Sequence, residues 1–373
     1  NIFLPPYGKF MDDYLPVGAH SEVDRSSRNI EVALALDMSG SMRGQKLRDL
    51  KAAAKDLVDL IVQPVQTPYY SRVALVPWSY SVNPGSYRDA VRGTVTGSTT
   101  ITDIGVNLTG PERSITKATR KRPVVITSRG HGFANGEVVW ISGVSGMSQI
   151  DDKAFVVAGR SNNTFQLNDR NGNRIDGRNY GRLFGSSGRV QRCQDDDCSV
   201  VVTSARHGLR DNEHVYITDV SGMNEVNDRT HLVGNATTDT YTIDMDAADL
   251  SSYRSGGRSW CTRQGCTYFT FENENRDLAT HRISACVTER TGREAYTDAA
   301  PTSAARVGRN YPDPDGDCMN STIQPLSSRI SQIKADIDDL SVSGSTAGQI
   351  GIAWGWYMVS PNFGSLWPSS AGA

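Results

Sequence analysis

The sequence lacks several features that would place it in common classes of protein. No apolar run approaches the roughly 20 residues that a membrane-spanning helix needs, so we expect no membrane span in this segment. The 39 basic and 41 acidic residues nearly cancel to a formal charge of −2, which gives no general attraction to nucleic acid. No nucleophile elbow, zinc-protease motif or phosphate-binding glycine loop follows a predicted strand. We therefore predict that the chain is not an enzyme, has no catalytic residues and binds no nucleic acid.

The composition is typical of a globular protein with many turns. The chain has 373 residues, of which 35 are Gly and 15 are Pro, and this length suggests two or three domains. Six cysteines in a chain rich in Thr, Ser, Asn and Gly favour disulfides and an oxidising compartment. The first residue is Asn1 rather than Met, as in a processed export product. We expect a periplasmic, cell-surface or extracellular location, with a membrane anchor upstream in the full-length protein.

The two ends of the chain have an α/β pattern. Residues 29–36 form a near-continuous apolar run, which is typical of a strand buried on both faces. Residues 45–62 have apolar side chains at helical spacing, and residues 72–78 form a second buried strand. This order predicts a βαβ unit with parallel strands. Helices are also expected over 325–340 and 349–359.

The middle of the chain consists of short alternating strands and contains an internal repeat. Three segments recur at a constant spacing of 76 residues: 124–132 with 200–208, 138–147 with 214–223, and 163–165 with 239–241. We therefore predict two tandem all-β modules inserted through a surface loop of the α/β domain. His131 and His207 occupy equivalent positions and are expected to stabilise a turn. The two repeats differ toward their C-terminal ends, where the first carries an extra loop around residues 171–173.

The predicted fold class is α/β, with a mostly parallel, Rossmann-like domain interrupted by two tandem all-β modules. The predicted segments are an N-terminal extension (1–28), the first part of the α/β domain (29–92), β module 1 with its linker (93–192), β module 2 (193–266), and the continued α/β domain (267–373).

Three oxygen-bearing side chains follow the first predicted strand. Asp37, Ser39 and Ser41 lie directly after it, where ligands of open α/β sheets bind. One carboxylate and two hydroxyls are hard ligands of the kind that Mg²⁺ or Ca²⁺ prefers. The pattern therefore predicts a divalent-metal site. The alternative is that the two serines only cap the following helix.

Residues 30–42 and the helix after them resemble a von Willebrand factor A domain with its metal-ion-dependent adhesion site. The resemblance narrows to the TadG-like proteins of tight-adherence (Flp) pilus assembly, and it covers residues 22–90 and 266–367. The phrases that carry it are 76–85, 286–290, 323–326, 344–346, 350–356 and 360–361.

The resemblance implies a role for specific residues. Asp37, Ser39 and Ser41 would be the first metal-binding loop, and Thr346 would be the threonine of the second, unless it caps a helix. The third-loop aspartate of the family, in a Thr-Asp-Gly phrase, does not follow Thr346. We therefore expect an incomplete domain. A bound Mg²⁺ or Ca²⁺ would accept a carboxylate from a protein partner, such as a pilus or surface component.

The β modules resemble the first catalytic-cysteine half-domain of ubiquitin-activating enzymes, a small module also seen in bacterial surface and phage proteins. None of the ubiquitin chemistry is implied, because no adenylation motif accompanies the repeats.

The cysteines have a regular spacing. Cys193 and Cys198 are separated like Cys261 and Cys266, and the two pairs lie 68 residues apart. Several pairings are possible from the sequence alone. We expect each close pair to form a short disulfide, which leaves Cys286 with Cys318. A four-cysteine zinc site is the alternative, although such sites usually have tighter spacing.

Three functions are compatible with these patterns. The leading hypothesis is a non-enzymatic surface or periplasmic binding protein of a tight-adherence type pilus system that uses the divalent-metal adhesion site. The alternative is a structural subunit of an extracellular filament or pilus tip with a vestigial metal site. An intracellular chelatase-type A domain is the third, and it predicts six reduced thiols.

Overall fold

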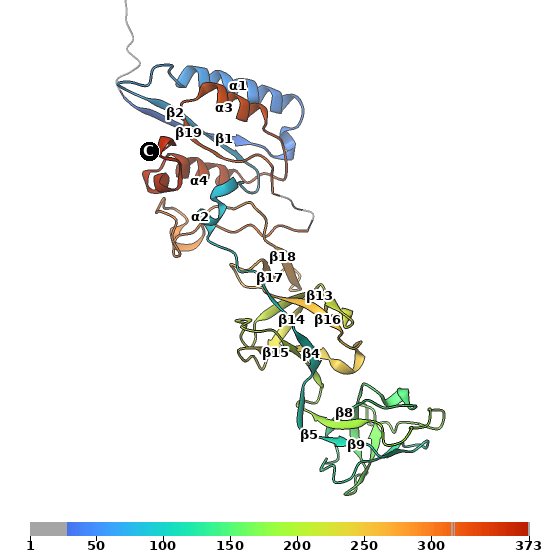
Figure 1. Ribbon diagram of the computed structural model, residues 1–373. Helices are drawn as coiled ribbons and strands as arrows, with labels where there is room; N and C mark the ends of the chain where they lie inside the picture. Colours follow the sequence, from blue (N-terminus) through green and yellow to red (C-terminus); the bar gives the residue numbers. More distant parts are fainter. Residues whose placement is uncertain (1–27, 315, 317, 372–373) are drawn as a thin grey trace, which may run out of the picture. The chain divides into compact units, whose positions relative to one another are not determined.

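The computed structural model describes residues 28–314, 316 and 318–371 (Figure 1). The predicted N-terminal extension therefore lies almost wholly outside the described residues. The chain divides into two compact units. Unit 1 is formed by the chain up to Ser79 and from Ser321 onward, and unit 2 is formed by Tyr80–Asn320.

Unit 1 is a small sheet between helices. Its elements are β1 (Ile30–Asp37), α1 (Gln45–Ile61), β2 (Ser71–Trp78), β19 (Gln324–Ser327), α3 (Ile330–Asp338) and α4 (Gly348–Val359). The sheet has the order β1-β2-β19. Helices α1 and α3 pack together on one face, and α4 covers β1 and β2 on the other (Figure 1). The predicted β1-α1-β2 unit is present, and its two strands are parallel.

The expectation of a mostly parallel, Rossmann-like von Willebrand factor A fold is wrong. In the described part of the chain, β1 with β2 is the one parallel pair of strands, and β19 runs antiparallel to β2. A parallel neighbour needs a crossover, usually a helix that packs on the sheet. Between β2 and β19 the chain instead forms the β-rich unit 2. The helix expected over 325–340 begins at Ile330, because residues 324–327 pair with β2.

Unit 2 contains two seven-stranded antiparallel sheets. We call the first module 1, which spans residues 108–193. Its strands are β5 (Leu108–Ser114), β6 (Lys117–Ala118), β7 (Val125–Thr127), β8 (Val138–Ser142), β9 (Lys153–Ala158), β10 (Thr164–Asn168) and β11 (Arg189–Cys193).

We call the second sheet module 2, which is built from residues 98–106 and 199–261. Its strands are β3 (Ser98–Thr100), β4 (Asp103–Val106), β12 (Ser199–Thr203), β13 (His214–Ser221), β14 (Arg229–Gly234), β15 (Thr240–Asp246) and β16 (Ser255–Cys261). The rest of unit 2 contains α2 (Arg88–Arg92) and the hairpin of β17 (Tyr268–Glu272) and β18 (Leu278–Arg282).

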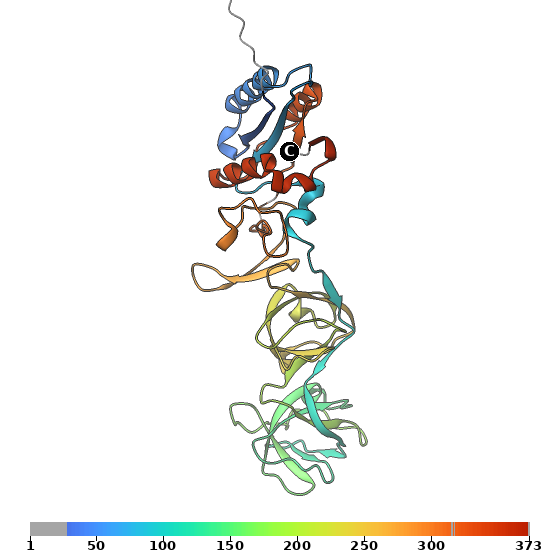
Figure 2. The ribbon, with the colours of Figure 1, turned by 90° about the vertical axis from the view of Figure 1, so that its left-hand side faces the viewer.

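The two modules share one topology. Module 1 has the order β5-β11-β8-β9-β10-β7-β6, and module 2 has β3-β16-β13-β14-β15-β12-β4. Each position in one order corresponds to the same position in the other. Both sheets curve around their own cores, which Figure 2 shows from a second side.

The modules are nested rather than simply consecutive. Strands β3 and β4 precede module 1 in the sequence, but they pair with β16 and β12 of module 2. The chain therefore begins module 2, completes all of module 1, and returns to finish module 2. The repeat at 76 residues does not reveal this arrangement, because the leading strands lie outside the repeated segments.

Candidate functional site

The residues predicted to bind a metal gather at one end of the unit 1 sheet. Asp37 ends β1, and its Oδ1 accepts a hydrogen bond from the Ser39 amide at 2.7 Å. The Ser39 and Ser41 hydroxyl oxygens are 3.0 Å apart. Gly40 donates its amide to the Gly344 carbonyl at 2.9 Å, which brings this loop to the turn that carries Thr346. Thr346 is exposed.

The expectation of a metal-ion-dependent adhesion site in a von Willebrand factor A domain is not supported. The surrounding sheet is not the mostly parallel sheet of that fold. Across the described residues, no group of three or more His, Cys, Asp or Glu side chains could hold a metal ion. The hydrogen bonds of Asp37 and Ser39 organise the turn after β1. Binding of Mg²⁺ or Ca²⁺ by the oxygens of Asp37, Ser39, Ser41 and Thr346 stays a sequence prediction.

Three disulfides are present, and two of them close the modules. Cys193 pairs with Cys198 at the end of module 1, and Cys261 pairs with Cys266 at the end of module 2. The third joins Cys286 to Cys318. These are the pairs that the spacing favoured, and no free cysteine remains in the described part of the chain. Each close pair staples the turn that follows the last strand of its module.

At each of these turns the incoming and outgoing chains are hydrogen-bonded to each other. Asn107 enters module 1, donates its amide to Ser199 and accepts from Gln194, both at 2.8 Å. Thr96 enters module 2, donates to the Gly265 carbonyl at 2.8 Å and accepts from Thr267 at 3.0 Å. Each module therefore begins and ends at its own closed junction.

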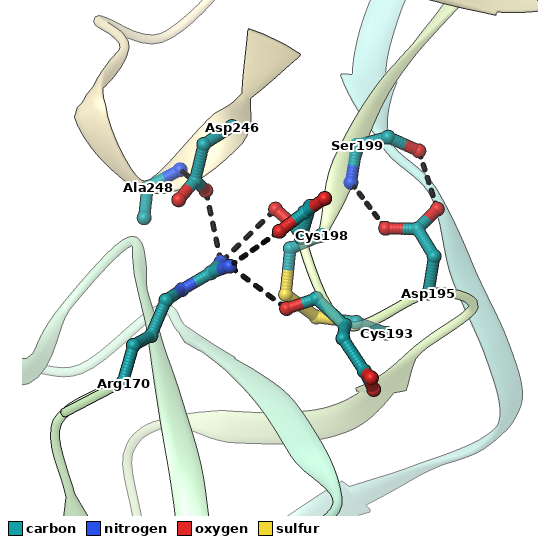
Figure 3. A network of polar contacts seen from close by, with 9 residues as sticks. Arg170, Cys193, Asp195, Cys198, Ser199, Asp246 and Ala248 are labelled. Atoms are coloured by element: carbon teal, nitrogen blue, oxygen red, sulfur yellow. Dashed lines mark hydrogen bonds and ion pairs between the residues drawn. A yellow bond between two sulfur atoms is a disulfide. The ribbon is translucent and has the colours of Figure 1, made fainter. Parts of the chain in front are cut away.

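The junction of module 1 is further organised by Asp195. Its carboxylate accepts hydrogen bonds from the Ser199 amide at 2.9 Å and from the Asn107 side chain at 3.1 Å. Burial raises the pKa of Asp195, but the bonds from Ser199 and Asn107 outweigh burial and the pKa is lowered overall. The ionised carboxylate is therefore the form that holds this turn. Figure 3 shows its two contacts with Ser199.

Arg170 of module 1 reaches across to module 2 (Figure 3). Its guanidinium donates to the carbonyls of Asp196 and Asp197 at 2.8 and 3.0 Å and to Asp246 Oδ1 at 3.0 Å. Asp246 Oδ1 also accepts from the Ala248 amide at 2.9 Å. Arg170 thus contacts both the stapled junction turn and the end of β15, which restrains module 1 against module 2.

Apolar packing accompanies this polar contact. Strand β8 is buried on both faces: Val139 and Ile141 belong to the core of module 1, whereas Val138 and Trp140 pack with the core of module 2. The Trp140 side chain is 8% exposed. Which core it joins depends on the docking of the modules.

Arg170 was missed by sequence reasoning, although one signal marked its neighbourhood. The first repeat carries an extra loop at residues 171–173, and Arg170 lies at its start. Asp246 is the residue 76 positions later, so the two repeats place opposite charges at equivalent positions and join them in an ion pair.

The repeated histidines stabilise turns, as predicted. His131 Nδ1 accepts from the Phe133 amide at 3.0 Å, and His207 Nδ1 accepts from the Leu209 amide at 3.1 Å. Both rings are buried. Burial lowers the pKa of His207, which favours the neutral ring that accepts this bond.

Among the described residues, no helix is long and apolar enough to cross a membrane.

Comparison with known proteins gives one match. Residues 197–262 match the family model of the ubiquitin-activating enzyme E1 FCCH domain, which covers most of module 2 and less than a fifth of the chain. No curated protein matches the chain significantly. The match supports the resemblance of module 2 to a part of ubiquitin-activating enzymes, and by itself it is no sign of enzymatic activity. Neither comparison supports the resemblance to TadG-like or von Willebrand factor A proteins.

Proposed function

We propose that this chain is a non-enzymatic protein of an oxidising compartment, the periplasm, cell surface or extracellular space, in which modules 1 and 2 serve as a structural insert. The insert holds its surfaces in a fixed arrangement for a protein partner. The observation that carries the proposal is the closed junction at each module. Incoming and outgoing strands are hydrogen-bonded side by side there, and a disulfide staples the outgoing turn.

The position of these disulfides supports a structural role. A disulfide that closes a loop of about five residues is worth roughly 2 kcal/mol in the chain-entropy account. Because each clip bridges the ends of the turn that follows its module, it also opposes local opening of that turn, which a structural insert requires. Structural disulfides persist in oxidising compartments.

The contacts between the modules support the same role. Val138 and Trp140 bury apolar surface against module 2, and Arg170 fixes the polar edge of the same joint. A freely hinged pair of modules would leave Trp140 exposed, at a cost set by its large apolar area. The joint is therefore expected to be stiff.

The test begins with the thiols of the full-length protein in the cell that produces it. Acid quenching followed by a mass-tagged maleimide is expected to label none of these six cysteines before reduction and all six afterwards. Six reduced thiols in the cell would contradict an oxidising compartment and favour an intracellular domain.

Limited proteolysis then tests the structural role. The paired variants C193S/C198S and C261S/C266S should open the turns at 193–198 and 261–266 and become cleaved there several-fold faster. The matched control is C286S/C318S, whose disulfide lies outside both modules and should leave these two turns protected. Equal protection of the turns in all variants would contradict the role assigned to the clips.

A further inference from the structure

A cavity of about 540 Å³ lies in unit 2, outside both modules, between the β17–β18 hairpin and the segment 303–311. The segment is anchored at several points. Val307 donates its amide to Val91, and Gly308 donates to Glu289. At Gly308 an added Cβ would lie 2.0 Å from the Thr288 hydroxyl, so this position requires glycine. The cavity wall is therefore built by specific contacts.

One side of the cavity is aromatic. Phe269 and Phe271 project from the same face of β17, with ring centroids 5.9 Å apart and planes at 25°. The Tyr311 ring lies 5.2 Å from Phe269. Tyr311 is fixed from behind, because its hydroxyl donates to the Cys266 carbonyl at 2.8 Å and accepts from the Gly265 amide at 3.2 Å. The three rings together line one side of the cavity.

The other side is positively charged. Arg306 and Arg309 line the cavity, and within the described residues neither makes an ion pair with a carboxylate. Arg309 is partly buried, and its Nε is buried without a hydrogen-bond partner in the described structure. Arg92 lies close by, and its nearest carboxylate is that of Asp89 at 3.7 Å. Two guanidinium groups that have no carboxylate partner in the described part of the chain therefore line the cavity.

Neutral hydrogen-bonding groups complete the lining: Gln264, Thr288, Thr291 and Ser303. A smaller cavity of about 250 Å³ adjoins the first, since Gln264 and Phe269 line both. Glu213 and Arg263 also line the smaller cavity and pair with each other at 3.1 Å, so their charges balance there.

We propose that this cavity binds an acidic sugar, a saccharide ring that carries a carboxylate. A guanidinium can bind a carboxylate through two parallel hydrogen bonds. The apolar face of a sugar ring packs on an aromatic ring, and its hydroxyls need the amide and hydroxyl partners that the lining supplies. A few placed polar groups on an apolar floor are typical of small-molecule sites.

This inference does not depend on the structural role proposed for modules 1 and 2, because the residues that line the larger cavity lie outside both modules and the arginine variants used below keep all three disulfides. Loss of sugar binding would leave that proposal standing. A failure of the thiol and proteolysis tests would in turn leave the cavity unaffected.

Titration calorimetry with the full chain tests the proposal. The probes are glucuronic acid and glucose as its uncharged counterpart. We expect saturable binding of glucuronic acid with a Kd of about 1 mM or tighter, and no saturation by glucose at about 10 mM.

Variants locate the binding. R309Q should weaken binding of glucuronic acid about tenfold or more. Because Arg309 is partly buried, R306Q at an exposed position provides a second test that does not threaten folding and should weaken binding several-fold. The matched control R293Q removes a guanidinium whose side chain is 92% exposed and lies outside the cavity, and it should bind like the unmodified chain.

Three results would overturn the proposal. Equal binding of glucose and glucuronic acid would remove the role of the carboxylate. Glucuronic acid binding that is unchanged in both R309Q and R306Q would place the ligand elsewhere. Saturable, R309Q-sensitive binding of an acetylated tripeptide ending in a free phenylalanine carboxylate, with no binding of the sugars, would identify a peptide site instead.

Discussion

Module 1 buries Phe155 and Phe165 at two positions where module 2, 76 residues later, buries His231 and Tyr241. Neither polar group in module 2 is left without a partner. His231 Nε2 contacts the Val226 carbonyl at 2.9 Å, and the Tyr241 hydroxyl donates to Ser259 Oγ at 2.8 Å. Buried polar groups are tolerated when hydrogen-bonded. The same scaffold therefore accepts either an apolar or a polar core.

The outer faces of the modules differ in a second way. In module 1, Val138 and Trp140 of β8 pack against module 2. In module 2, the equivalent Tyr216 of β13 has its ring 4.5 Å from that of Tyr268 in the β17–β18 hairpin. Both repeats therefore bury this face. In module 1 it packs on module 2, and in module 2 it packs on the β17–β18 hairpin. The modules thus share a docking face but dock on different neighbours.

The largest expected loss of stability comes from truncating a side chain on this docking face. Trp140→Ala should destabilise the joint by about 3–5 kcal/mol, because it removes a large side chain that is 92% buried between two cores. Tyr216→Ala, at the partly exposed equivalent position, should cost less. Hydrogen exchange followed by mass spectrometry resolves the modules separately and measures both. A Trp140→Ala effect no greater than that of Tyr216→Ala would contradict the importance given to the joint.

Exchanging the core aromatics should have an intermediate effect. Phe165→Tyr places a hydroxyl in an apolar core and should cost about 1–3 kcal/mol. Tyr241→Phe leaves Ser259, which is 3% exposed, without this bond and should cost about 1 kcal/mol. Thermal unfolding of each variant gives the comparison. If neither exchange changed the unfolding temperature, the polar groups in the core of module 2 would contribute nothing to its stability.

Loss of the Arg170 contacts should have a smaller effect, confined to the joint. Arg170→Ala should cost about 1 kcal/mol, because the side chain is 30% exposed and its ion pairs are screened by water. Faster proteolysis of the turn at 193–198 is the readout. The matched control is Arg178→Ala, since Arg178 pairs with Asp176 within module 1 and is 67% exposed. Equal effects of the two variants would deny Arg170 a role between the modules.

The smallest effect concerns pH. Burial lowers the pKa of His231 in the folded module, against the opposing influence of the Val226 carbonyl and Asp244. The unfolded chain therefore binds a proton that the folded one does not, so stability is full above about pH 6.5 and falls as the pH drops toward the folded pKa. His231→Phe, which restores the residue type of module 1, should reduce this acid loss.

Urea unfolding of the unmodified chain and of His231→Phe between pH 7.5 and 5 measures the effect. His207, whose pKa burial also lowers, remains in the variant, so part of the acid sensitivity should persist. An identical pH dependence of the two proteins would show that His231 is not responsible. The variant should lose about 1 kcal/mol at pH 7.5, because the Val226 carbonyl loses its ring partner.

Local patterns predicted much of unit 1 correctly. The apolar run and the helical spacing that follows it located β1, α1 and β2 within a residue or two. The polar turn after β1 was found, and the structure brings Asp37, Ser39 and Ser41 together there. The fold class was wrong because it depended on strand pairing. Neither the apolar periodicity nor the strand propensity of residues 324–327 indicates which strand they pair with, or in which direction.

By itself, the sequence determined the features that a local rule governs. The repeat at 76 residues specified two cores of the same design, the spacing of the cysteines indicated which close pairs could bridge, and each repeated histidine needed only its own turn. Tertiary structure alone decided the nesting of module 1 within module 2, the burial of Trp140 against a second core, and the reach of Arg170 to Asp246. The physical reason is that periodicity reports which face of an element is buried, whereas the partner that buries it is set by the path of the whole chain.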